Sequence, residues 1–150
     1  MAFRPQTPFL AVDGIVNLQD EKGKFLGIVL IERKYPPVGL ALPGGFVEIG
    51  ESVEEAVIRE MKEETSLDVI AVRQFRVYSE PDRDPRFHVV SVVFECVARG
   101  EPKGRDDAKV ARLYHYREIP LESLVFDHSK ILKDYLSSPF ALFKGGKVEL

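Results

Sequence analysis

The chain has 150 residues, of which 45% are hydrophobic, which is enough for one domain with a core and too few for two. Its formal net charge of −3 argues against a general nucleic-acid binder. No run approaches the roughly 18 apolar residues of a membrane helix, and the first residues do not resemble a signal peptide. We therefore expect a cytoplasmic protein with a single domain over residues 1–150.

Two apolar runs near the N-terminus predict strands over Phe9–Leu18 and Phe25–Ile31. The residues between them, 19–24, are polar and typical of a turn. The chain therefore begins with two strands in succession.

A helix is predicted to begin after Ser52, because Ser52 and Glu55 have the spacing of a capping box. At about 100° per residue, Val53, Ala56 and Val57 fall within one sector of the helix surface. This sector should face the core.

Three carboxylates, Glu60, Glu63 and Glu64, follow in the last turns of this helix, where the helix dipole makes each acid cost roughly 0.3–1 kcal/mol. The same geometry places Glu60 and Glu64 in the middle of the apolar sector and Glu63 at its edge. A solvated acidic face is the alternative, but it does not explain acids on the apolar side. Like charges that are partly buried need compensation, and Mg²⁺ or Mn²⁺ with their preference for oxygen ligands are the natural partners.

Further strands are predicted after the helix, over Ile70–Tyr78, His88–Ala98 and Ala111–Tyr116, and Leu121–Leu136 is expected to contain a second helix. The run 88–98 is apolar on both faces, as in a central strand covered on both sides. Cys96 lies within it and is expected to be a packing residue. Strands interleaved with few helices predict an α/β sandwich.

The segment around the predicted helix resembles the Nudix box. From Gly45 it runs through five residues to Glu51, then seven residues to Arg59-Glu60-Met61, one residue, and Glu63-Glu64, and it closes on the aliphatic Leu67. One position departs from the family pattern, because Ser66 stands where glycine is usual. Ser66 is at the expected left-handed position after the helix, so serine there should cost about 1 kcal/mol and leave the chemistry intact.

The resemblance implies a Nudix hydrolase with an α/β/α sandwich and a mixed β-sheet. It implies that Glu60, Glu63 and Glu64 bind the catalytic metals, and that the backbone carbonyl of Gly44 completes the metal shell. The other box residues are implied to be structural, with an ion pair that holds the loop against the helix: Gly45, Glu51 and Arg59.

The segment 78–88 contains two prolines, three acids and two arginines between two predicted strands, which favours a structured ligand-binding loop over a salt-bridged surface turn. Within the Nudix family it resembles the corresponding segment of small ADP-ribose pyrophosphatases. Arg83 and Arg86 are candidates to grip a phosphate or ribose, with Asp82 and Asp84 as competing partners. We favour Arg86.

Three other side chains are candidates for substrate binding. Arg33 is a second candidate for a phosphate, with a surface charge at a strand end as the alternative. Phe9 and Tyr78 are candidates to stack on adenine, with core or rim packing as the alternative. We expect the histidines, His88, His115 and His128, to be packing residues and not catalytic ones.

Family members often take the general base from a loop outside the box, and the suitable loop here spans residues 100–107. Within it we rank Asp106 and Asp107 above Glu101, with solvated turn residues as the alternative. Glu60 could itself orient the attacking water.

Mg²⁺ ions held by clustered carboxylates can bridge a pyrophosphate and lower the pKa of a bound water. We therefore expect Mg²⁺-dependent hydrolysis of a nucleoside diphosphate linked to another moiety, with ADP-ribose giving AMP and ribose 5-phosphate. The resemblance also implies a homodimer. Two alternatives use the same fold: a housecleaning hydrolase of oxidised nucleoside triphosphates or dinucleoside polyphosphates, and a non-catalytic domain that senses ADP-ribose.

Overall fold

The computed structural model describes residues 2–104 and 109–138. Within these ranges the chain forms β1 (Phe9–Gln19), β2 (Phe25–Arg33), β3 (Gly39–Ala41), β4 (Gly44–Phe46), α1 (Val53–Thr65), β5 (Asp68–Tyr78), β6 (Val89–Arg99), β7 (Lys109–Tyr114), a short 3₁₀ helix (Tyr116–Glu118) and α2 (His128–Leu136). None of the helices described has both the length and the apolar character that crossing a bilayer requires.

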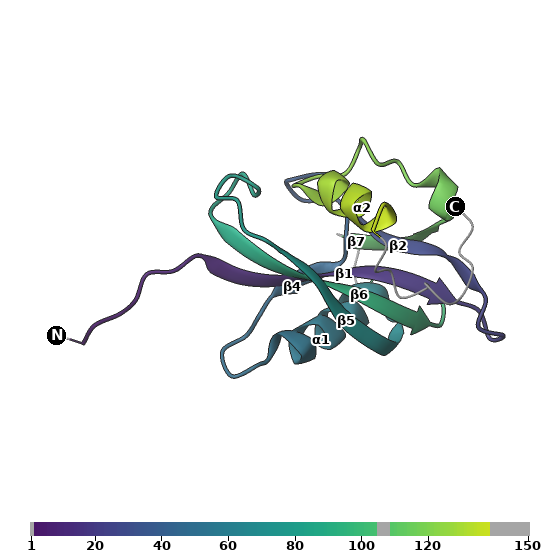
Figure 1. Ribbon diagram of the computed structural model, residues 1–150, viewed down its shortest axis with the longest axis horizontal. Helices are drawn as coiled ribbons and strands as arrows, with labels where there is room; N and C mark the ends of the chain where they lie inside the picture. The colour runs from purple at the N-terminus through teal and green to yellow at the C-terminus, as the bar shows by residue number, and fades with distance from the viewer. Residues whose placement is uncertain (1, 105–108, 139–150) are drawn as a thin grey trace.

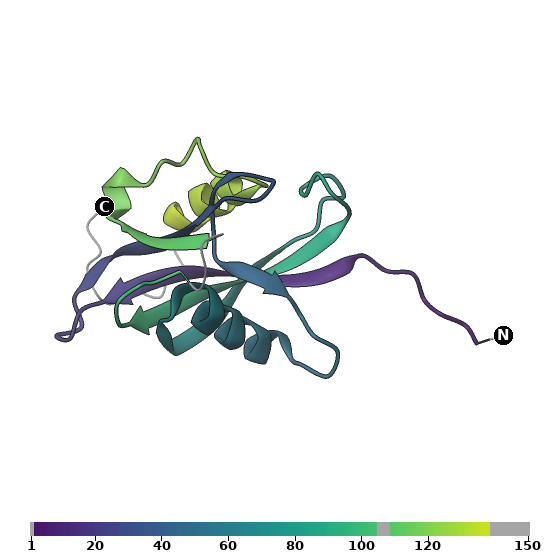
Figure 2. The same cartoon turned by 180° about the vertical axis from the view of Figure 1, so that it is seen from behind.

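The strands form one mixed sheet in the order β3-β2-β1-β6-β5, with β4 paired to β1 and β7 paired to β2. The central strands β1 and β6 run parallel, whereas the other pairs are antiparallel. Helix α1 covers one face of the sheet and α2 covers the other (Figure 1), and the reverse view shows the same three layers (Figure 2). The predicted α/β/α sandwich is confirmed.

Two apolar cores lie on the two faces of the sheet, because strand residues alternate between faces. Val12 and Val16 of β1 pack with Met61 of α1, whereas Ile15 belongs to the core with Leu132 of α2. The central strand β6 is buried on both faces, as its continuous apolar run predicted.

Cys96 confirms its predicted packing role. It lies in the core on the α1 side and is fully buried. Burial raises the pKa of the Cys96 thiol to about 12, so the thiol stays protonated and inert.

Helix α1 begins and ends as the sequence predicts. The Ser52 hydroxyl accepts a hydrogen bond from the Glu55 amide at 3.1 Å, as in a capping box, and donates to the Glu55 carboxylate at 3.2 Å. At the other end, Ser66 is left-handed with φ of 64°, and its amide donates to the Lys62 carbonyl.

Strand β7 ends at Tyr114, whereas the sequence predicted a strand through Tyr116. Tyr116 begins the 3₁₀ helix, its side chain is buried, and its hydroxyl donates to the Asn17 side chain at 3.1 Å. This long-range contact overrides the local strand preference. The second helix occupies the C-terminal part of the range predicted for it, and β3 and β4 are too short for the sequence pattern to reveal.

Candidate active site

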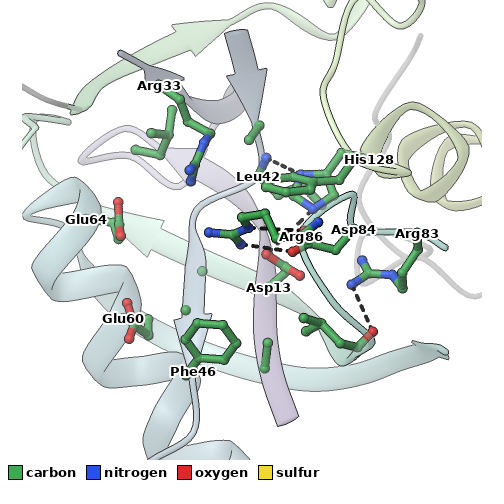
Figure 3. Close-up of a pocket in the computed structure, with 17 residues that line it drawn as sticks. Asp13, Arg33, Leu42, Phe46, Glu60, Glu64, Arg83, Asp84, Arg86 and His128 are labelled. Carbon is green, nitrogen blue, oxygen red and sulfur yellow. Dashed lines mark hydrogen bonds and ion pairs between the residues drawn. The ribbon is translucent and has the colours of Figure 1, made fainter. Parts of the chain in front are cut away.

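A cavity of about 330 Å³ opens between α1, the β4 backbone, the loop 79–88 and the start of α2. On one side lie Glu60 and Glu64, which we call the acidic wall. Three cationic side chains also line the cavity, Arg33, Arg83 and Arg86, which we call the arginine wall. The remaining acids of the lining are Asp13 and Asp84. Figure 3 shows Arg33 and Arg86 directed toward the side on which Glu60 and Glu64 lie, whereas Arg83 lies farther from these acids.

The acidic wall comes from adjacent turns of α1. Glu60 and Glu64 are buried, with exposed fractions of 8% and 9%, so they do extend the apolar stripe as predicted. Burial raises the pKa of Glu60, and a hydrogen bond from Arg59 offsets part of that increase. Gly45 lies directly against Glu60, because a Cβ at this position would clash with the carboxylate. Glycine at this position therefore makes room for a buried acid.

Arg59 holds the loop before α1 against the helix. Its Nε and Nη2 atoms donate to the Glu51 carboxylate at 2.6 and 2.9 Å, which is the predicted structural pair. This pairing lowers the pKa of Glu51 to about 2. The Nη1 atom donates to Glu60 at 2.8 Å and to Glu63 at 3.2 Å. The guanidinium thus supplies the positive charge that the acidic cluster needs in this structure.

The residues predicted to bind metal gather at one end of the cavity, except for Glu63. Glu60, Glu64 and Gly44 line it, whereas Glu63 lies at the edge with a side chain that is 40% exposed. Within the described ranges, no three carboxylate, imidazole or thiol groups converge on one point where a metal ion could sit. The donors nevertheless suit Mg²⁺, because they are oxygens and two of them belong to buried carboxylates. A bound metal would compete with Arg59 for Glu60 and Glu63.

The two loop arginines differ in how they are held. Asp127 accepts from both Nε and Nη2 of Arg83, at 2.9 and 2.7 Å, and the Arg83 side chain is only 4% exposed. Asp84 accepts from Arg86 at 3.1 and 2.9 Å, while the Arg86 side chain is 41% exposed. Asp84 is therefore the competing partner foreseen from the sequence, and Arg86 keeps access to the cavity.

Arg33 lies at the end of β2 and lines the cavity instead of pointing to bulk solvent. Its Nε donates to the Pro37 carbonyl at 2.9 Å and its Nη2 donates to the Pro36 carbonyl at 3.3 Å. Burial, together with the nearby Arg86, lowers the pKa of Arg33. Two like charges thus face the same cavity.

The aromatic candidates lie outside the cavity lining. Phe9 is exposed and its ring centroid is 4.9 Å from Phe87 and 5.8 Å from Phe46, so it packs at the rim. Tyr78 is buried in the core on the α2 side, and its hydroxyl donates to Asp134 at 2.8 Å. These positions match the packing alternatives for both residues. The lining aromatic side chains are instead Phe46 and Phe126.

The proposed general bases Asp106 and Asp107 lie outside the described residues. Glu101, which ranked below them, is exposed and forms an ion pair with Lys103 at 3.8 Å. Their assignment as general bases stays a prediction.

Sequence reasoning missed two buried polar residues at the cavity floor, Asp13 and His128. The Ser91 hydroxyl donates to Asp13, yet burial raises the pKa of Asp13 to about 6. Burial lowers the pKa of His128 to about 3, and its Nδ1 accepts from the Leu42 amide at 2.9 Å. A single acid before glycine in an apolar strand was a usable signal for Asp13. No comparable pattern marked His128.

Comparison with known proteins assigns the family. The model of the NUDIX domain matches residues 8–135, so the chain belongs to the Nudix family. An ADP-ribose pyrophosphatase of Methanocaldococcus jannaschii is 52% identical over 132 residues, which are 86% of this chain and 73% of that protein.

Solved structures share the architecture. A MutT/nudix family protein from Listeria innocua is 34% identical with a TM-score of 0.69, covering 88% of this chain and 94% of that one. The NUDIX domain of Shewanella oneidensis NrtR, in a complex with ADP ribose, has a TM-score of 0.72 at 22% identity, covering 85% of this chain and 86% of that domain. At this identity the second likeness concerns the fold alone.

Proposed function

We propose that this Nudix hydrolase cleaves the pyrophosphate bond of ADP-ribose and releases AMP and ribose 5-phosphate. The observation that carries the proposal is the 52% identity to the ADP-ribose pyrophosphatase of Methanocaldococcus jannaschii over 86% of the chain. The cavity supports it, because an acidic wall and an arginine wall face one another across a space lined by Phe46 and Phe126.

Each wall has a distinct task in this proposal. Glu60, Glu63, Glu64 and the Gly44 carbonyl would hold Mg²⁺, or Mn²⁺ in its place. When bound, such ions would neutralise charge on the diphosphate and lower the pKa of a water molecule. Arg33 and Arg86 donate hydrogen bonds to the diphosphate from the other side and neutralise its charge.

Ion-paired side chains keep both walls in position. Glu51 fixes Arg59 through two hydrogen bonds, and Arg59 in turn orients Glu60. Asp84 fixes Arg86 in the same way. The substrate therefore meets groups that are already oriented, which lowers the cost of reaching the transition state.

We test the substrate by incubating the protein and Mg²⁺ with ADP-ribose, 8-oxo-dGTP and diadenosine tetraphosphate, and separating the products by anion-exchange chromatography. The expected result is AMP and ribose 5-phosphate from ADP-ribose, with the largest kcat/KM in the panel. The matched control is Glu64→Gln at equal concentration, which excludes a contaminating hydrolase.

Two other results would each replace the proposal. A larger kcat/KM for 8-oxo-dGTP or for the dinucleotide would identify a housecleaning enzyme. Binding of ADP-ribose in calorimetry without turnover would identify a sensing domain.

We also propose that the protein acts as a homodimer in the cytoplasm, as the family resemblance implies. Light scattering coupled to size-exclusion chromatography gives its mass in solution. Twice the chain mass of 17.0 kDa is the expected value.

A further inference from the structure

Three consecutive residues at the start of α2 each hold a different part of the cavity. The Phe126 ring lies beneath the guanidinium groups of both Arg33 and Arg86, at 5.3 and 5.6 Å from its centroid. Asp127 pairs with Arg83, and His128 accepts from the Leu42 amide. This short segment therefore connects the arginine wall to the backbone that leads into Gly44.

Phe126 has an unusual backbone. Its φ is 56°, and among the described residues other than glycine only Ser66 shares a positive value. A large side chain in this region is strained and persists only where its surroundings enforce it. Ser66 ends a helix, where the left-handed conformation has a local use. Phe126 does not end a helix. It lies in the turn closed by the hydrogen bond from the His128 amide to the Val125 carbonyl at 3.3 Å, and its conformation in that turn places the ring against the two arginines.

The Phe126 ring offsets the repulsion between two nearby cations. Arg33 and Arg86 carry like charges toward one cavity, and Arg33 is partly buried there. An aromatic face attracts each guanidinium through its quadrupole, so a single ring stabilises both cations in proximity. Phe87 lies under Arg86 as well, at 5.2 Å, but it makes no such contact with Arg33 within the described part of the chain.

Each of the two arginines also retains donors for a ligand. Pro36 and Pro37 occupy Nε and Nη2 of Arg33, and Asp84 occupies Nε and Nη2 of Arg86. Across the described residues, neither Nη1 group makes a hydrogen bond. Figure 3 shows both guanidinium ends directed into the cavity, facing the side on which Glu64 lies.

We propose that Phe126 is a positioning residue that holds Arg33 and Arg86 together as one paired binding unit for the diphosphate of the substrate. The inference rests on the proposed function, because a diphosphate supplies two adjacent anionic groups for two guanidinium groups. Phe126 itself need not touch the substrate. Its effect on binding passes through the two arginines.

The test compares Phe126→Asn with Phe126→Tyr. Asparagine tolerates the left-handed conformation but has no ring, whereas tyrosine keeps the ring. For Phe126→Asn we expect KM for ADP-ribose to rise about five- to thirtyfold, as the loss of cation–π contacts predicts, with kcat within about threefold of the wild type. Phe126→Tyr should restore most of the affinity. The melting temperature of Phe126→Asn should not fall, because the backbone strain is relieved.

A second measurement separates this inference from the proposed substrate. Calorimetric titration with inorganic pyrophosphate, without metal, reports on the paired arginines whether or not ADP-ribose is hydrolysed. Phe126→Asn should weaken pyrophosphate binding. In the double variant Phe126→Asn/Arg86→Ala, the loss of pyrophosphate binding free energy should be smaller than the sum of the losses in the two single variants. Both changes disrupt the same pair of arginines.

Two outcomes would overturn the inference. One is unchanged pyrophosphate affinity and KM in Phe126→Asn. The other is equal weakening in Phe126→Asn and Phe126→Tyr together with a lowered melting temperature in both, which would make Phe126 an ordinary packing residue.

Discussion

The two walls of the cavity are built in different ways. Glu60 and Glu64 are one helical turn apart, so the geometry of α1 alone brings them together. Arg33 ends β2, Arg83 and Arg86 come from the loop before β6, and their supports Phe126 and Asp127 precede α2. Residues that are close in sequence form the acidic wall, whereas residues from distant segments form the arginine wall. Substitutions on the acidic wall should therefore affect chemistry first, whereas several on the arginine wall should affect stability first.

The largest expected effect is on catalysis from the acidic wall. Glu64→Gln should lower kcat by about 10²–10⁴, the range for loss of a group that organises the metal. Its metal-free unfolding free energy should stay within about 1 kcal/mol of the wild type, because a like charge near a helix C-terminus is removed. Steady-state kinetics and urea denaturation measure the two effects. Glu54→Gln, on the exposed side of the same helix, is the control. A kcat of Glu64→Gln within tenfold of the wild type would contradict the assignment of the metal site.

Arg83→Met tests the tertiary wall. It leaves Asp127, whose side chain is only 18% exposed, without its guanidinium, and loss of one partner of a buried pair costs about 3–5 kcal/mol. Arg86→Ala also leaves a buried carboxylate, Asp84, whose side chain is only 4% exposed, but Asp84 keeps the hydrogen bond from the backbone amide of residue 86 and lies near Arg83. We therefore expect a smaller stability loss of about 1–3 kcal/mol, together with a fall in kcat/KM of about ten- to a hundredfold, mainly through KM. Urea denaturation and steady-state kinetics on both variants test this contrast. Equal changes in unfolding free energy and in kcat/KM for the two substitutions would contradict it. Asp84→Ala should reproduce the kinetic loss.

His128 predicts how stability depends on pH. Its folded pKa of about 3 lies below the ordinary 6.5, so the unfolded chain binds a proton that the folded protein excludes. Stability from this group is complete above pH 6.5 and is lost as the pH falls toward 3. Between about pH 6.5 and 4.5 the wild type should lose about 2–3 kcal/mol more than His128→Gln. Urea denaturation at both pH values measures the difference. Parallel losses in the two proteins would show that His128 titrates normally.

The smallest effect concerns the end of the helix that carries the acidic wall. Ser66→Gly should raise the unfolding free energy by about 0.5–1 kcal/mol, because glycine adopts the left-handed conformation without strain. The gain is limited by loss of the hydrogen bond from the Ser66 hydroxyl to the Lys103 carbonyl. Thermal denaturation measures the change, and kcat should be unaltered. A stability loss instead would mean that this hydrogen bond outweighs the backbone strain.

The sequence was sufficient for features that depend on neighbouring residues. The capping box at Ser52, the burial of Glu60 and Glu64, and the left-handed Ser66 all follow from helical geometry and lie where it predicts. The pairing of Arg59 with Glu51 followed from the family resemblance.

Contacts between distant residues were not predictable. Asp127 is 44 residues from Arg83, and His128 is 86 residues from Leu42, so no periodicity relates either pair. Strand β7 ends earlier than predicted for the same reason, because the Tyr116 hydroxyl donates to Asn17, which is far away in the sequence. Local pattern therefore identified the acidic wall, whereas the supports of the arginine wall required the folded structure.

The parallel pairing of the central strands determines when the site can form. Phe9 pairs with Val89, so β1 meets its neighbour β6 only after about half of the chain has been looped out between them. Contacts of such long sequence separation slow folding, because the entropy of closing the loop is lost before the contacts form. The floor of the cavity depends on this step, since Asp13 comes from β1 and its partner Ser91 from β6. During synthesis, a chain ending at residue 88 already contains every glutamate of the acidic wall, yet it has no cavity for them to line.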